Sequence, residues 1–159
     1  YLKQIIEDAL KNQLLSSDPF YGYNLKSELV DKDFLIEPDI VKLLEWKFES
    51  SHLERVRDMF LFCCFTGLAY IDAYNLRKQD IITDADGMKW IVIFRTKSSI
   101  QANIPLLEFP STVIKKYEGI SEDRLLPMDT NQKMNVYLKE IAKICNINKK
   151  LTTHVARHN

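Results

Sequence analysis

Apolar residues recur every three or four positions in several separate stretches of this chain, which is the spacing of an amphipathic helix. We expect helices over residues 1–15, 38–48, 51–66, 70–75, 110–117 and 130–145. Ser51 can cap the third of them, and Gly67 is the kind of residue at which a helix usually ends. Near the end of the chain, Thr152 or Thr153 can cap a last helix that begins at His154.

The middle of the chain has a different pattern, with β-branched and aromatic residues in short runs between turns. Residues 80–83 and 88–95 are expected to form a hairpin around the turn Asp84–Gly87. Residues 102–106 follow as a third strand after a turn at 96–100. The pattern therefore predicts an α+β fold that is mainly helical, with a small three-stranded antiparallel sheet.

Residues 19–33 show no clear period and contain Gly22 among mixed charges, so they are the best candidate for a linker. Residues 1–18 would then be the last helix of a preceding domain, and residues 34–159 the main domain. A chain of 159 residues is long enough for one domain that buries a core without disulfides or metals.

Total charge gives little information, but its distribution does. The chain has 22 basic and 22 acidic residues, whereas a nucleic-acid-binding protein usually carries a basic excess. Residues 1–60 hold eight basic and twelve acidic residues, and residues 61–159 hold fourteen and ten. No acidic residue follows Glu140, so the C-terminal end, with Lys149 and Lys150, is a basic patch of the kind that contacts phosphates.

Cysteine content and hydropathy bear on the compartment. Three cysteines lack metal-ligand spacing, and Cys63 and Cys64 lie together in an apolar run. They indicate buried thiols in a reducing environment, so we expect a cytoplasmic protein. No apolar stretch approaches the length of a membrane span, and residues 1–14 carry charges that a signal peptide would exclude.

The strongest candidate for chemistry is the pair His154 and Arg157. Three residues apart, they share one face of the expected last helix, and with the N–H groups at its start they suit a phosphate that gains negative charge. An equally good interpretation of this pattern alone is that His154 caps the helix and Arg157 lies on the surface. Lys97 lies at a hairpin tip, where lysine is common, and can reach a DNA groove to offer a proton.

A metal site is a further interpretation of the same segment. His154 and His158 are four residues apart, which is the spacing of helical zinc ligands and raises the alternative of a metallohydrolase. Val155 stands where a metalloprotease motif requires glutamate. We therefore expect no metal.

Four segments, in order and spacing, resemble the tyrosine recombinases. They are residues 62–72 (the family's first box), 95–106 (the hairpin that carries a lysine), 125–142 (the stretch before the second box) and 151–158 (the second box). The resemblance covers essentially the whole chain and is closest to integrases from mobile elements of anaerobic gut bacteria.

The resemblance implies site-specific DNA recombination and integration through a 3′-phosphotyrosyl intermediate. It implies that Lys97 protonates the 5′-oxygen leaving group, while His154 and Arg157 hold the scissile phosphate. It also implies double-stranded DNA as the partner, a tetramer on DNA in the full-length protein, and neither metal nor cofactor. Contacts to DNA are expected from Arg95, Lys97, Lys149, Lys150 and Arg157.

The domain borders take names from this resemblance. Residues 1–18 correspond to the last helix of a core-binding domain, 19–33 to the linker, and 34–159 to a catalytic domain that ends before its nucleophilic tyrosine. We therefore expect the parent protein to be an enzyme and this chain by itself to be inactive.

The chain departs from the family pattern at two of its positions. Ala69 stands where the family usually has its first arginine, and Asn159 stands where a threonine or serine usually follows. Alanine cannot hold a phosphate, and Arg95 or Arg77 are candidate substitutes. Ala69 and the zero net charge raise an alternative function, a non-catalytic DNA-binding relative that keeps the fold.

Overall fold

The computed structural model describes residues 2–23, 34–121 and 123–157, and the chain divides into two units, Tyr1–Asp31 and Lys32–Asn159. In the first unit, α1 (Leu2–Lys11) is shorter than the expected helix 1–15. Gln13 adopts φ of 57°, the left-handed conformation that ends helices. None of the residues of α1 is buried. The domain borders expected at residues 18 and 33 remain predictions.

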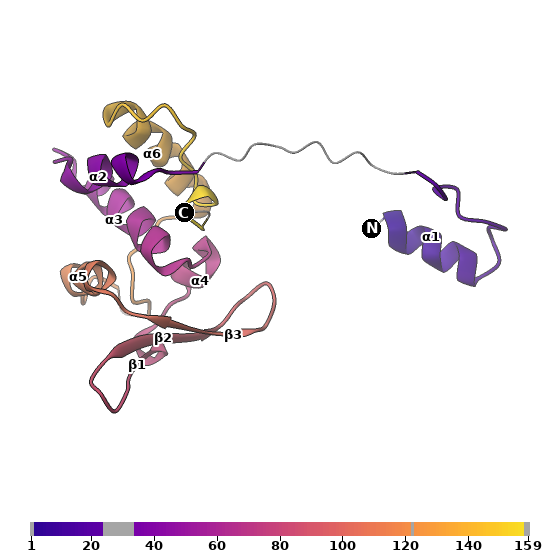
Figure 1. Ribbon diagram of the computed structural model, residues 1–159, viewed down its shortest axis with the longest axis horizontal. Coiled ribbons are helices and arrows are strands. Elements are labelled where there is room, and N and C mark those ends of the chain that lie inside the picture. The colour runs from indigo at the N-terminus through magenta and orange to yellow at the C-terminus, as the bar shows by residue number, and fades with distance from the viewer. Residues whose placement is uncertain (1, 24–33, 122, 158–159) are drawn as a thin grey trace. The chain divides into compact units, whose positions relative to one another are not determined.

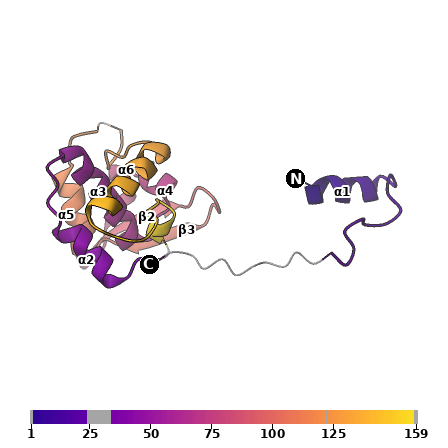
Figure 2. The ribbon, with the colours of Figure 1, turned by 90° about the horizontal axis from the view of Figure 1, so that it is seen from above.

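The second unit contains a helical part and a small sheet (Figures 1 and 2). Its elements are α2 (Glu37–Glu45), α3 (Ser51–Thr66), α4 (Tyr70–Tyr74), η1 (Lys78–Asp80), β1 (Ile81–Thr83), β2 (Lys89–Phe94), β3 (Gln101–Pro105), α5 (Glu108–Lys116), α6 (Asn131–Ile144) and η2 (Val155–Arg157). In Figure 1, α3 lies between α2 and α6 on one side and α5 and the sheet on the other. The expected α+β fold with a three-stranded antiparallel sheet is confirmed. No helix in the described ranges is long and apolar enough to cross a membrane.

Helix α3 forms the centre of the unit because it is buried on nearly every side. Residues 59–63 are all buried, which an all-round apolar run predicts for an interior helix. Its N-cap is Ser50, whose Oγ accepts a hydrogen bond from Leu53 N–H at 3.5 Å. The expected cap, Ser51, is wrong because Ser51 is already the first helical residue. It ends at Gly67 as predicted, with φ of +64°. A Cβ on Gly67 would meet no atom within 4 Å, so the backbone conformation and not crowding requires glycine.

Helices α2 and α6 each bury a narrow apolar stripe. On α2, Leu43 is fully buried, whereas Val41 and Leu44 are 41% and 37% exposed. Trp46, just after the helix, is 42% exposed. On α6 the buried residues are Met134, Leu138, Ile141 and Ala142. Ile144 is 36% exposed because it falls beside that stripe.

The sheet has the order β1-β2-β3, with both pairs antiparallel. Ile91 of β2 is fully buried between Ile81 of β1 and Ile104 of β3, and these three side chains anchor the sheet to the core. Asp84 shapes the first turn, because its carboxylate accepts from the N–H groups of Asp86 and Met88 at 3.0 and 2.9 Å. The three expected strands are therefore confirmed within one or two residues at each end.

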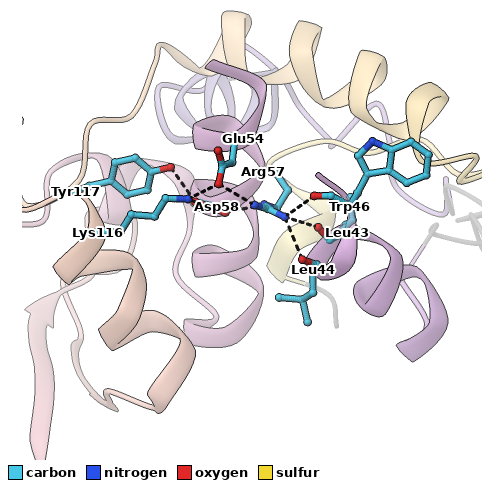
Figure 3. Close-up of polar contacts among 8 residues, drawn as sticks. All are labelled: Leu43, Leu44, Trp46, Glu54, Arg57, Asp58, Lys116 and Tyr117. Carbon is cyan, nitrogen blue, oxygen red and sulfur yellow. Dashed lines mark hydrogen bonds and ion pairs between the residues drawn. The ribbon is translucent and has the colours of Figure 1, made fainter. Parts of the chain in front are cut away.

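A buried arginine joins α3 to the end of α2 (Figure 3). Arg57 Nη1 donates to three backbone carbonyl oxygens, those of Leu43 at 2.7 Å and of Leu44 and Trp46 at 3.3 Å. The last carbonyls of a helix lack partners within the helix, so the guanidinium satisfies groups that α2 itself leaves open. No pattern in the sequence predicts this role of Arg57.

Next to Arg57, the carboxylate of Asp58 contacts charged and polar groups from α3 and from the end of α5 (Figure 3). Its carboxylate contacts Arg57 Nε at 2.6 Å and accepts from Lys116 Nζ at 2.7 Å and from Tyr117 Oη at 2.8 Å. Burial, followed by the bond to the Asp58 carboxylate, raises the pKa of Tyr117 to about 12. Burial lowers the pKa of Lys116, but the bonds to Asp58 and Glu54 outweigh it and the net shift is upward. The network ties α5 to α3.

Candidate functional site

The corner between α3 and α4 brings the region of the first box next to the start of α6. Ala69 is the N-cap residue of α4, and Tyr70 begins that helix. The hydroxyl of Tyr70 donates to the carbonyl oxygen of Asp129 at 2.9 Å, one residue before the cap of α6. Burial raises the pKa of Tyr70, so this hydroxyl stays protonated and holds the two helix starts together.

A surface pocket of about 270 Å³ opens at this junction. It is lined by Ala69, Tyr70, Ile71, Asn131, Thr153 and His154. The structure therefore brings His154 together with the position where the resembling family has its first arginine. These residues lie far apart in the sequence, and their meeting is a result of the fold.

A capped turn shapes the segment that carries His154. The carbonyl oxygen and the hydroxyl of Thr152 accept hydrogen bonds from Val155 N–H at 3.0 and 3.4 Å. Thr152, one of the two expected caps, therefore caps the final turn. The expected helix is a 3-10 turn, η2, which begins at Val155 and not at His154. His154 is exposed beside it. The side chain of Arg157 and residues 158–159 lie outside what the structure describes, so the shared face of His154 and Arg157 remains a prediction.

Lys97 is exposed in the turn between β2 and β3, and a buried carboxylate fixes that turn. Asp72 of α4, only 6% exposed, accepts from the backbone N–H of Thr96 at 2.9 Å. Ser99 closes the turn with φ of 54° and donates its N–H to the carbonyl of Arg95 at 2.8 Å. Asp72 is not among the predicted site residues, although an acidic residue inside an apolar helix is a usable signal.

Arg95, one of the two suggested substitutes for the missing arginine, comes just after β2. It does not share a strand face with Lys97, because β2 ends at Phe94 and both residues follow the strand. Arg95 Nη1 is buried and makes no hydrogen bond to the described residues. Arg77, the other suggestion, is exposed. Neither of them is among the residues that line the pocket of Ala69 and His154.

Lys149 and Lys150 line a second pocket, of about 360 Å³, together with Lys139 and Lys143 of α6. Lys149 is partly neutralised, because its Nζ lies 2.8 Å from Asp39 Oδ2. Burial raises the pKa of Asp39, but the bonds from Lys149 and from a backbone N–H outweigh it and the pKa is lowered. The other lysines of the pocket are exposed.

The described residues contain no group of three or more histidine, cysteine, aspartate or glutamate side chains that could hold a metal ion. The alternative site of His154 and His158 cannot be placed, because His158 lies outside the described residues.

Neither a family model nor a curated protein matches this chain. Solved structures do. A lambda integrase dimer bound to a COC′ core site matches with a TM-score of 0.75 and 14% identity, over 98% of this chain and 58% of that one. The XerH site-specific recombinase bound to palindromic difH gives 0.66 and 19%, over 86% and 43% of the two chains. The FLP recombinase–Holliday junction complex gives 0.52 and 15%, over 98% and 46%.

The chain has the tyrosine recombinase fold. It spans about half the length of the solved structures that it matches. At these identities the likeness concerns the fold. The family resemblance of the four sequence segments is therefore confirmed at the level of the fold, while the roles of Lys97, His154 and Arg157 remain predictions.

Proposed function

We propose that this chain is part of the catalytic domain of a site-specific DNA recombinase, which breaks and rejoins strands through a 3′-phosphotyrosyl intermediate to integrate a mobile element. The observation that supports it best is the pocket shared by Ala69 and His154, in a fold whose solved examples include recombinases bound to DNA. A lambda integrase tetramer bound to a Holliday junction also has this fold, so we include self-association on DNA in the proposal.

The proposed roles follow from position and charge. His154, exposed at the pocket, and Arg157 hold the scissile phosphate, and Lys97 is the general acid. An exposed lysine on an anchored turn suits that task, because the turn is fixed while the long side chain remains free to move. Arg95, Lys149 and Lys150 contact the DNA backbone. No metal or other cofactor takes part in the proposed reaction.

The nucleophilic tyrosine is proposed to come from outside these 159 residues. Tyr117 is buried with a raised pKa, and Tyr70 donates to a backbone carbonyl, so both hydroxyls are held in the neutral form. Tyr74 packs on Tyr70, and Tyr137 packs on His52, with ring centroids 5.5 and 4.4 Å apart. These contacts suit structural tyrosines.

We also propose a cytoplasmic location. Cys63 and Cys145 are buried free thiols, and burial raises the pKa of both, which keeps them unreactive. Cys64, expected to be buried, is only half-buried. Thiols without disulfide partners suit a reducing compartment.

The second candidate is a non-catalytic DNA-binding relative, which the alanine at position 69 favours. Both candidates bind DNA, but only the first cleaves it. Strand exchange by the full-length protein therefore separates them, and in the enzyme a Lys97→Ala change should abolish it.

The decisive experiment uses this chain and its parent with a nicked suicide duplex. We expect the chain to bind duplex DNA weakly, with an affinity that falls steeply as salt rises, and to form no covalent adduct. The full-length protein should form a covalent protein–DNA band. Absence of DNA binding would contradict the proposal, and a covalent band from the chain alone would contradict the placement of the nucleophile.

A further inference from the structure

The side chains that hold the His154 segment form a short chain of hydrogen bonds. Thr153 N–H donates to Asn135 Oδ1 at 2.9 Å. Asn135 Nδ2 donates to Asn131 Oδ1 at 3.2 Å, and Thr153 Oγ1 donates to the same oxygen at 2.7 Å. Asn131 and Asn135 are one turn apart on α6, so the first turn of this helix holds the residue before His154.

This hydrogen-bond network determines the orientation of the side-chain amides of Asn135 and Asn131. A backbone N–H can only donate, so the Asn135 atom opposite Thr153 must be the carbonyl oxygen. The other end of Asn135 is then its NH₂ group, which must face an acceptor, and that acceptor is Asn131 Oδ1. Asn131 therefore turns its NH₂ group away from the network, independently of how the amide is drawn.

The NH₂ group so oriented belongs to a residue that lines the pocket of Ala69 and His154. Asn131 is exposed, and its Nδ2 makes no hydrogen bond to any residue that the structure describes. A pocket that combines an unoccupied donor, a histidine and an alanine in place of a longer side chain has room and hydrogen-bonding capacity for an anion.

We propose that Asn131 Nδ2 is a ligand of the DNA phosphate that enters this pocket, and that Asn135 and Thr153 are its positioning residues. Asn131 thereby supplies a neutral donor where Ala69 offers none. The inference rests on the proposed function and adds to it a residue with a stated atom and role.

A purely structural role for Asn131 predicts something different. Such a role needs only its acceptor, Oδ1, which holds Thr153 and Asn135. Asn131→Asp keeps that acceptor in the same place and replaces the NH₂ donor with a charged carboxylate oxygen. The variant should therefore fold normally in either case, and a loss of phosphate binding greater than the added charge alone causes would mark the donor as a ligand.

The matched control is Gln132→Glu, which adds the same charge at an exposed position in the same turn of α6. General repulsion of DNA by one added carboxylate affects both variants about equally. We expect Asn131→Asp to weaken duplex binding by this chain about 10-fold more than Gln132→Glu, as for the loss of a hydrogen bond to a charged group. Equal losses in the two variants would overturn the inference.

A gain-of-function variant gives an independent measurement. Ala69→Arg places a guanidinium in the same pocket, so in that background Asn131→Asp should cost less than threefold in affinity. An undiminished 10-fold loss would show that the two residues do not serve one phosphate, and would contradict the inference.

Titration of the ¹⁵N-labelled chain with inorganic phosphate separates this inference from the proposed function. We expect the side-chain NH₂ resonances of Asn131 to shift, and those of Gln132 to stay. If DNA does not bind but phosphate shifts the Asn131 signal, the proposed function fails and the anion site stands. If DNA binds and neither phosphate nor DNA shifts that signal, the site fails and the function stands.

Discussion

At the scale of the residue, the burial of the Asp58 carboxylate depends on partners that the sequence does not predict. Its carboxylate lies inside an apolar helix and interacts with Arg57, Lys116 and Tyr117 at 2.6–2.8 Å. Leaving a buried polar group without its partner costs more than the hydrogen bond contributes, so each donor in this network matters. Residues 116 and 117 lie some 60 positions away, and no local pattern links them to Asp58.

We predict that Tyr117→Phe lowers the free energy of unfolding by about 1.5–2 kcal/mol, because it removes a donor to a buried carboxylate. Tyr74→Phe is the control, since the Tyr74 hydroxyl makes no hydrogen bond within the described residues, and it should change stability by less than about 0.5 kcal/mol. Urea denaturation measures both. Equal effects of the two variants would contradict a role for the Tyr117 hydroxyl.

The same network gives stability a defined dependence on pH. The pKa of Tyr117 is raised to about 12 in the folded chain, above its ordinary value of 10, so its contribution is complete below pH 10 and is lost as pH rises toward 12. The raised pKa of Lys116 acts in the same direction. In Tyr117→Phe, the fall in unfolding free energy between pH 10 and 12 should therefore be shallower.

At the scale of the element, local sequence signals predicted where helices end and where strands lie, but not which elements pack together. Gly67 ended α3 where its left-handed backbone is needed, and the strands followed their β-branched runs. The cap moved from Ser51 to Ser50 because adjacent serines carry the same signal. The site was harder to predict. His154 could be selected from its spacing in the sequence, whereas the bond between Asn131 and Thr153 forms only because α6 and the segment before η2 meet in space.

The turn that carries Lys97 depends on Asp72, and this dependence is testable. Asp72→Ala removes the acceptor of Thr96 N–H, so we predict faster hydrogen exchange at that amide and at least threefold weaker binding of duplex DNA. Asp72→Asn keeps a side-chain oxygen at the same place and should preserve most of both properties. If the exchange rate of the Thr96 amide is the same in Asp72→Ala and the unchanged chain, the anchor has no role.

At the scale of the whole molecule, the hydrophobic core belongs to one unit. Every residue of the buried cluster lies between Leu35 and Ala156, and α1 buries none of its residues. Burial of apolar surface is the main source of stability, so the first unit should contribute little to it.

We therefore predict that a chain that begins at Lys32 unfolds in one cooperative transition, with a midpoint within about 2 °C of the longer chain and the same dependence on urea. Thermal and urea denaturation, followed by circular dichroism, provide the measurement. A loss of more than about 2 kcal/mol would mean that residues 1–31 take part in the fold of the second unit.

The two tryptophans give this unit its own optical reporters. Trp46 lies half-exposed after α2, where Arg57 holds its carbonyl, and Trp90 lies in β2, where its indole N–H donates to Asp84 at 2.8 Å. One therefore reports on the helical part and the other on the sheet. Fluorescence from single-tryptophan versions would show, without any label, whether the two parts melt together and which of them senses a nucleic acid.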